Sequence, residues 1–295
     1  MSLLIEVVVL GLLIGGVYAM LSVGLTLIFG VMRIIDFAYG DCVVLGMYGT
    51  LLFHDHISAS PYVTALVIAP VFFVGGALVY GLVLLPLAKR PDAHLNQTIV
   101  TLGLSLMVLN LLTMRAGATS RVLTTSLTAA SIQIGSVSIR SVYAVAFGLA
   151  LAVTVVLWLW LRRTRTGKSL RAVAQDRTAA ELLGISPHRS EMMSFGIGTA
   201  LAGVAGAVMI PFYAVTPQAD VPLALVAYVT IVLGGLGSVP GAVVGGLIIG
   251  LVESLTSYYI NSELSTAFYL VVFVVVLIVR PYGLFGSRAW GVRAQ

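Results

Sequence analysis

Long apolar runs, separated by short clusters of charged residues, make up most of this chain. Runs without a charged residue cover positions 7–32, 57–88, 93–114, 141–161, 192–219 and 221–252, and a shorter run covers 266–279. A helix of about 20 apolar residues is long enough to cross the hydrocarbon core of a bilayer. The pattern therefore predicts an all-α, polytopic helical membrane protein.

Two stretches depart from simple spans. The apolar piece Cys42–Phe53 ends at His54-Asp55-His56 and is too short to cross the membrane upright, and the run 221–252 is interrupted by the sequence GGLGSVPG at 234–241. The interruption predicts a hairpin between two short helices. Short or Gly/Pro-broken segments in a transporter often line the substrate path, but an ordinary kinked helix packed in protein gives the same pattern.

The segment between Ala116 and Arg140 carries few charges but is rich in serine and threonine. This composition favours an exposed loop with room for a small strand pair over another span.

Basic residues set the expected orientation, because they accumulate in cytoplasmic loops. With the N-terminus outside and the spans alternating, 13 of the 16 lysines and arginines lie inside, and Arg115, Arg121 and Arg140 lie outside. We therefore expect an N-out/C-in protein with about 8–9 membrane segments, including short or broken helices.

Composition supports this class. Hydrophobic residues make up 59% of the chain and charged residues 9%, whereas soluble domains carry roughly 25% charged residues. The single cysteine, Cys42, excludes an internal disulfide framework. The net charge of +5 follows the predicted topology, so it gives no reason to invoke nucleic acid.

One long segment, 164–187, is polar and strongly basic (TRTGKSLRAVAQDRTAAELLGISP). Its apolar positions recur at helical spacing: Leu170, Val173, Ala174, Ala180, Leu183 and Ile185. This predicts one short amphipathic helix that ends at Gly184, with Pro187 stopping it before the next span. A helix this charged cannot enter lipid, so we expect it to dock on another protein at the cytoplasmic face.

A nucleotide site is not expected in this segment. Gly167-Lys168-Ser169 matches the end of a phosphate-binding loop, but position 162, where the loop needs glycine, is Arg162.

The sequence of this segment resembles a known family. Residues 178–184 (TAAELLG) are similar to the Glu-Ala-Ala-x-x-x-Gly signature of bacterial ABC importer permeases, with Thr178 at the Glu position. The wider run TGKSLRAVAQDRTAAELLGI resembles the branched-chain amino acid ABC transporter permeases of LivH type. So do GLLIGGVYAMLSVGLTLIFGVMRIIDFAYGD near the start and VLGGLGSVPGAVVGGLIIGLVES near the end, and the resemblance covers essentially the whole chain.

The resemblance implies a single ABC importer transmembrane domain over residues 1–295, with a cytoplasmic coupling loop at 162–190 and an external loop at 116–140. The chain would form half of the pathway for branched-chain or other hydrophobic amino acids in the bacterial cytoplasmic (inner) membrane. Implied partners are a sibling permease of LivM type, two cytoplasmic ATPase subunits of LivF and LivG type, and an external substrate-binding protein. ATP and magnesium would bind the ATPase subunits, so this chain is expected to hold no cofactor and to catalyse no reaction itself.

The resemblance also assigns the residues that couple to the ATPase. They are Arg171, Asp176, Arg177, Thr178, Ala179, Ala180, Glu181 and Gly184. Thr178 in place of glutamate suggests that one charge contact is missing or is replaced by Asp176 or Glu181.

The stretch 36–40 (DFAYG) departs from the family, which commonly has Asn and then Ala-His-Gly there. This leaves urea, amides, and aromatic or aliphatic carboxylates open as substrates. Asp36, Tyr39 and Asp41 are candidates for the translocation path, because ionisable groups at membrane depth are costly and usually functional. Alternatively, both aspartates lie at the inner interface, where Asp36 would offset Arg33.

The remaining candidates are structural. Gly237, Gly241, Gly245, Gly246 and Gly250 have the spacing that lets membrane helices pack closely. His54 and His56 lack further ligands nearby, so no metal site is expected.

Two other classes of function remain to be compared. An ion-coupled secondary transporter would need buried ionisable groups, for which only Asp36, Asp41 and Glu253 qualify. A membrane-embedded enzyme would need clustered His, Asp or Glu, which the sequence lacks.

Overall fold

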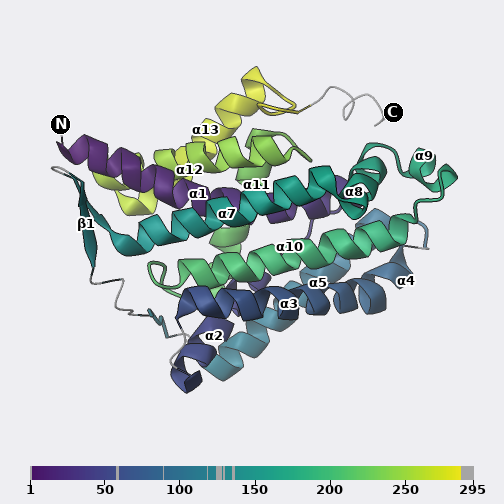
Figure 1. The fold of residues 1–295 in the computed structure, drawn as a ribbon, viewed down its shortest axis with the longest axis horizontal. Coiled ribbons are helices and arrows are strands. Elements are labelled where there is room, and N and C mark those ends of the chain that lie inside the picture. Colours follow the sequence, from purple (N-terminus) through teal and green to yellow (C-terminus); the bar gives the residue numbers. More distant parts are fainter. Residues whose placement is uncertain are drawn as a thin grey trace.

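The apolar runs form long helices in the computed structural model, which describes residues 2–57, 60–88, 90–117, 119–123, 128, 130–134 and 137–286 (Figure 1). Seven helical stretches in this part of the chain are long and apolar enough to cross a membrane. They are built from α1 (Ser2–Met32), α3 (Pro61–Val79) with its continuation, α5 (Ala93–Ala116), α7 (Ser141–Arg163), α10 (Pro187–Met209), α11 (Asp220–Gly234) and α12 (Val239–Tyr259). Two further helices, α2 (Tyr39–Ile57) and α13 (Ser265–Val279), complete the bundle. The predicted all-α, polytopic fold is confirmed.

The polar segment forms α8 (Arg165–Gln175) and α9 (Arg177–Leu182). Figure 1 shows them at the opposite end of the bundle from the start of α1. This is the relative placement that the charge distribution predicts. That prediction also used Lys89, Arg288 and Arg293, which lie outside the described residues.

Helix α10 lies at the centre of the bundle. In its apolar stretch 83% of the residues are buried, compared with 11% in α5. Small residues make this possible: a Cβ added at Gly198 would lie 2.9 Å from the carbonyl oxygen of Gly24, and one at Gly206 would overlap the backbone at Val43. Helices α1 and α2 therefore pack backbone to backbone against α10. The predicted span from Met192 begins earlier, because Pro187 opens α10 rather than merely ending the preceding helix.

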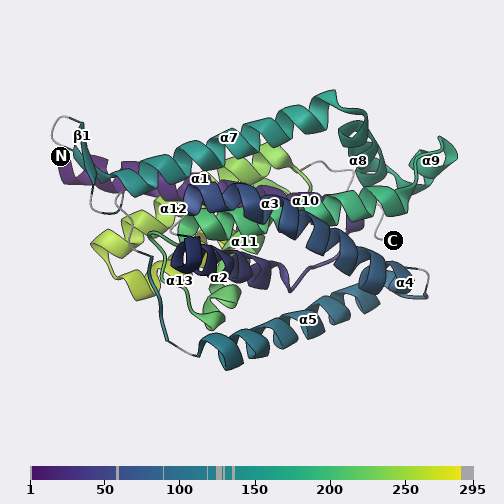
Figure 2. The ribbon, with the colours of Figure 1, turned by 60° about the horizontal axis from the view of Figure 1, so that its bottom comes forward.

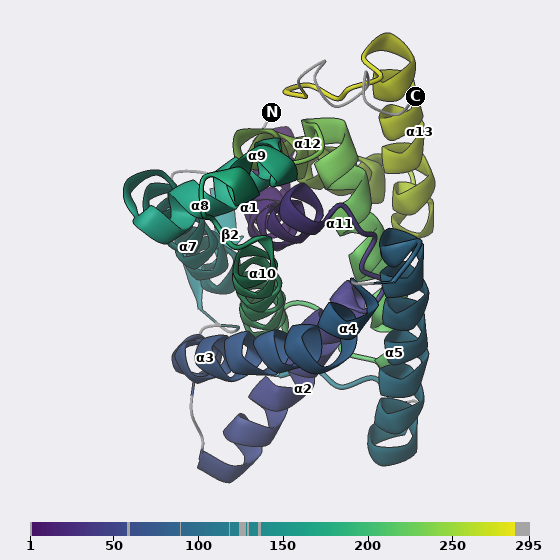
Figure 3. The same cartoon turned by 90° about the vertical axis from the view of Figure 1, so that its right-hand side faces the viewer.

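The prediction that the apolar piece Cys42–Phe53 is too short to cross the membrane was wrong. Helix α2 has 19 residues and continues through His54-Asp55-His56, which gives it a length of about 28 Å. Histidines in the last helical turn face the negative end of the helix dipole, so the charged triplet does not have to end the helix. Figure 3 shows α2 running obliquely to the long axis of the bundle.

Helix α3 is interrupted near its end by a π-helical turn, η1 (Tyr80–Leu84), followed by α4 (Leu85–Leu87). The backbone N–H of Leu85 donates to the carbonyl of Tyr80, one residue further back than in an α-helix. Pro86, the next residue, has no N–H to donate, so one backbone hydrogen bond of the regular ladder is missing there.

The predicted hairpin is present between α11 and α12, but its helices are longer than predicted: both belong to stretches long enough to cross a membrane, and α12 has 21 residues. Glycines bring these helices close: a Cβ at Gly245 would lie 2.6 Å from the Thr230 carbonyl oxygen, and one at Gly241 would overlap the backbone of Gly234. Gly246 and Gly250 lie on the side of α12 that meets α1. Gly237 departs from the prediction, because it precedes α12 and lies in the turn with φ of 79°, a conformation that glycine adopts readily.

The loop before α7 contains the small strand pair. Strands β1 (Ser131–Ile134) and β2 (Val137–Arg140) are antiparallel, with Ser131 opposite Arg140. Arg121 and Val215 exchange backbone hydrogen bonds of 3.1 and 2.9 Å, which fix this loop to the segment after α10.

Helix α5 stands apart from the other spans (Figure 2). Its contacts include hydrogen bonds from the Gln97 amide to the Leu84 carbonyl, 3.0 Å, and from the Thr101 hydroxyl to the Ile35 carbonyl, 3.3 Å. Most of its apolar surface is left for lipid or another chain.

Candidate functional site

Helices α8 and α9 are separated by one residue, Asp176. Its backbone is extended, with φ −150° and ψ 109°, and its carboxylate accepts a 3.0 Å hydrogen bond from the Ala179 N–H. Aspartate is a strong N-cap, because its side chain satisfies a free N–H at the helix start. The cap starts α9 in a new direction, so the prediction of one continuous helix through this segment was wrong.

The end of α9 follows the predicted glycine stop. Gly184 has φ of 78°, its N–H donates to the Glu181 carbonyl, and the Ile185 N–H donates to Ala180. This pair of bonds is the Schellman motif, which closes helix C-termini with a glycine in the left-handed region.

The apolar face of this segment divides into two sets. Leu170, Val173 and Ala180 are buried against the bundle. Leu182 and Leu183 are 84% and 79% exposed, so Leu183 does not belong to the inward face predicted for it. Two adjacent exposed leucines on a protruding element are typical of a protein-docking surface.

The predicted ATPase-coupling residues occupy this same element. Asp176 is partly buried and caps α9, and Ala180 is buried, whereas the others are exposed: Arg171, Arg177, Thr178, Ala179, Glu181 and Gly184. The sequence did not single out Leu182, although its place beside Leu183 in the stretch TAAELLG was the available signal.

One predicted coupling residue points back towards the bundle. Arg177 forms an ion pair with Glu191 of α10, Nη1 to Oε1 2.6 Å. The Tyr80 hydroxyl donates to Oε2 of the same carboxylate, 2.5 Å. Sequence reasoning missed Glu191, because its partner Tyr80 lies 111 residues away along the chain.

A second feature lies between α2, α3, α5 and α10. Here a cavity of about 290 Å³ has two carboxylates, Asp36 and Asp41, on walls that are otherwise mostly apolar. Its other lining residues include Leu45, Phe72, Val79, Leu104, Phe195 and Thr199.

Both carboxylates are buried, with Asp36 0% and Asp41 1% exposed. Oδ2 of Asp36 and both carboxylate oxygens of Asp41 have no hydrogen-bond partner among the described residues. Asp220, at the start of α11, is a third buried aspartate beside them, because its backbone oxygen closely approaches Gly40. Sequence reasoning did not include Asp220. The other oxygen of Asp36, Oδ1, accepts a 3.2 Å hydrogen bond from the Ala38 N–H. Buried carboxylate oxygens without partners are costly, which marks this cavity as a second candidate site.

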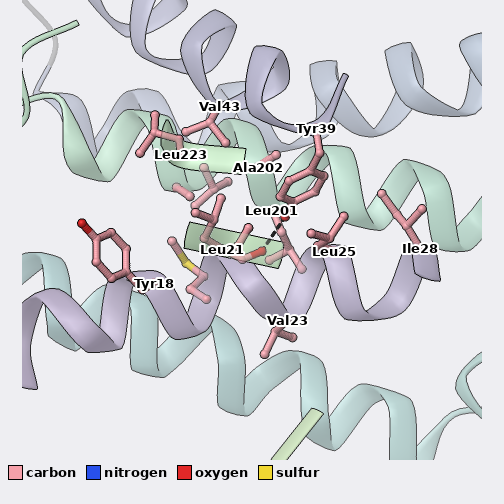
Figure 4. Packing of buried hydrophobic residues seen from close by; sticks show 14 of the residues in the cluster. Tyr18, Leu21, Val23, Leu25, Ile28, Tyr39, Val43, Leu201, Ala202 and Leu223 are labelled. Carbon is pink, nitrogen blue, oxygen red and sulfur yellow. Dashed lines mark hydrogen bonds between the residues drawn. The ribbon is translucent and has the colours of Figure 1, made fainter. Parts of the chain in front are cut away.

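Tyr39 does not line the cavity. Its ring is fully buried between α1 and α10, and its hydroxyl donates a 2.6 Å hydrogen bond to the Leu21 carbonyl (Figure 4). The structure thus separates Tyr39, which packs in the core, from Asp36 and Asp41, which border the cavity.

Comparison with known proteins identifies the family. The sequence model described as the branched-chain amino acid transport system permease component matches residues 7–278. The high-affinity branched-chain amino acid transport permease LivH of Escherichia coli is 31% identical, with 94% of this chain and 93% of the relative covered. LivH of Salmonella typhimurium is 30% identical over the same shares. BraD of Pseudomonas aeruginosa is 27% identical, with 94% of each chain covered.

No solved structure matches the chain. The family match spans nearly all the described helices, and the relatives it is similar to are transport permeases, not enzymes. The chain therefore belongs to the family of permease components of branched-chain amino acid transport systems.

Proposed function

We propose that this chain is one permease subunit of an ABC importer in the bacterial cytoplasmic membrane and forms half of the pathway for branched-chain or other hydrophobic amino acids. The observation that carries the proposal is the protruding α8–α9 element, whose exposed leucines and charges suit a docking surface. Its occupant is a cytoplasmic ATPase subunit, which holds the ATP and magnesium. A sibling permease of LivM type, two ATPases of LivF and LivG type, and an external binding protein complete the assembly.

The docking surface couples ATP hydrolysis by the ATPase to the change of state of the membrane helices. A bound partner shifts a two-state protein only through different affinities for the two states. Closure of the ATPase dimer on ATP must therefore change its contact with α9, and the bundle responds by opening to the other side.

The acidic cavity provides a passage for the substrate. An amino acid carries an ammonium group, which offsets the charge of Asp41 and Asp36, and a hydrophobic side chain suits walls such as Phe72 and Leu104. A solute that carries only a carboxylate would be repelled there. The cavity thus favours amino acids over aliphatic and aromatic carboxylates.

Reconstitution tests the function. Proteoliposomes that hold this chain, the sibling permease and both ATPases should accumulate radiolabelled leucine when supplied with ATP and loaded binding protein. Omitting this chain should abolish uptake, and ionophores should leave it unchanged. Uptake by this chain alone, driven by an ion gradient, would establish the ion-coupled transporter instead.

Replacing Asp41 with asparagine should lower leucine uptake about tenfold, the effect of losing about 1.4 kcal/mol of binding. The change removes a buried, unpaired charge, so the melting temperature of the protein should stay equal or rise. Initial uptake rates in proteoliposomes and thermal melting in detergent give the two values.

Asp220→Asn is the control, because Asp220 is also buried, 5% exposed, but does not border the cavity. It should retain more uptake than Asp41→Asn. Equal losses from both variants would assign the effect to general electrostatics and not to the cavity.

A further inference from the structure

Glu191 is a buried acid near the start of the most buried span. It lies in the second turn of α10, and its side chain is 3% exposed. A carboxylate in such a place is tolerated only when partners compensate its lost hydration.

Three residues from three separate elements meet this carboxylate. Arg177 comes from α9 (2.6 Å to Oε1), Tyr80 from η1 (2.5 Å to Oε2) and His188 from the first turn of α10 (Nδ1 3.6 Å from Oε2). We call these four residues the Glu191 network. It is a direct polar connection from the docking element to the membrane helices.

The network ends at an unusual backbone. Tyr80 is the first residue of the π-helical turn in α3. Such turns are rare and occur frequently at functional sites. The hydroxyl of Tyr80 therefore connects Glu191 to a point where α3 departs from regular helical bonding.

The same helix face leads from the network to the cavity. Glu191, Phe195 and Thr199 are spaced four residues apart, so they lie on one side of α10. Phe195 and Thr199 line the cavity, and so does Val79 of α3, which precedes Tyr80. A displacement of α10 and α3 at Glu191 would therefore change the shape of the cavity walls.

We infer that Glu191 is the positioning residue that transmits movement of α9 to α10 and to the π-helical turn of α3. The inference rests on the proposed function. When the ATPase displaces α9, Arg177 either carries Glu191 with it or leaves a buried carboxylate without its cationic partner. Both outcomes change the relative stability of the two states of the bundle.

The first test replaces Glu191 with glutamine in the complete complex. Basal ATP hydrolysis should persist, because Glu191 is buried away from the docking surface. The ratio of leucine taken up to ATP hydrolysed should fall about tenfold, which lies within the usual range of allosteric effects between two sites. Asp55→Asn is the control: it makes the same carboxylate-to-amide change at an exposed position near the end of α2, outside the docking element, and should keep the wild-type ratio.

A double-mutant cycle tests whether the residues act together. The double variant Arg177→Met/Glu191→Gln should lower the ratio of leucine uptake to ATP hydrolysis by less than the product of the two single effects, because each single variant already breaks the same connection. Tyr80→Phe removes only a hydroxyl and leaves the ring packed, so it should fold normally and still lower the ratio, about threefold. The inference is overturned if the effects of Arg177→Met and Glu191→Gln on the uptake ratio multiply strictly. It is also overturned if Glu191→Gln and Tyr80→Phe both keep the wild-type ratio.

Hydrogen exchange of this chain alone, in detergent, separates the inference from the proposed function. Glu191→Gln should speed backbone exchange in α9, which loses its ion pair, and Asp55→Asn should not. Unchanged exchange in α9 overturns the connection. A wild-type complex that takes up no leucine overturns the proposed function, whatever the exchange shows.

Discussion

Replacing Leu182 and Leu183 together with aspartate is expected to abolish ATP-driven uptake. Both side chains are almost bare in the isolated chain, 84% and 79% exposed, and the proposed complex buries them against an ATPase. Burial of one leucine contributes about 1.5–3 kcal/mol. Losing two, with charges added to an apolar contact, should weaken ATPase binding by on the order of 100-fold or more. Co-purification of the ATPase subunits and leucine uptake in proteoliposomes measure the two effects.

The fold of the double variant should be unaffected, because neither leucine packs against the bundle. Its melting temperature should therefore match the wild type. Thr178→Asp adds a negative charge to the same exposed surface without removing an apolar side chain, so it measures how much of the loss comes from charge alone. Wild-type retention of the ATPases by the Leu182/Leu183 variant would show that the docking surface lies elsewhere.

The membrane spans could be predicted from the sequence because lipid constrains each of them separately. Charge-free runs gave α5 and α7 to within two residues, since a charged side chain at membrane depth is costly whatever the neighbours are. The run 221–252 gave the start of α11, but α12 continues beyond it through Glu253 to Tyr259. The length of α2 was missed because His54-Asp55-His56 ends the apolar run without ending the helix, which continues to Ile57.

The break between α8 and α9 could not be predicted from helical spacing alone, because local side-chain and backbone interactions compete there. Helical spacing favoured one helix through 170–184, but the Asp176 side chain bonds to the backbone and starts a second helix. Leu183 matched the apolar period and nevertheless lies on the exposed side, because the break at Asp176 resets the helical phase.

The candidate sites could be predicted only in part, for a tertiary reason. Asp36 and Asp41 were identified because they are ionisable groups near the apolar runs. Tyr39, between them, points into the core, and only the packing of α1 determines this. Glu191 and Asp220 acquire their surroundings from helices distant in sequence, which no local pattern records.

Replacing Gly246 with leucine is expected to destabilise the fold strongly. A Cβ at this position would lie 2.5 Å from the Ala19 nitrogen and 2.6 Å from its Cα, so the obstacle is backbone of α1, which cannot rotate away. Helices α1 and α12 would have to separate. Overpacking of this kind costs 1–3 kcal/mol or more, and we expect the melting temperature in detergent to fall by about 10 °C or the monodisperse peak to disappear. Gly246→Ala should show a smaller loss in the same direction.

Gly148→Leu on α7 is the matched control for that experiment, because a Cβ there meets nothing within 4 Å. It inserts the same side chain into a membrane helix of the same protein, so any cost of leucine itself in a span appears in both variants. The difference between the two melting temperatures then isolates the close approach of α1 and α12. Equal stability of the two variants would mean that α12 can move away from α1 at little cost. In that case the glycines of α12 would not be holding the bundle together, and their close spacing would have to serve contact with another chain.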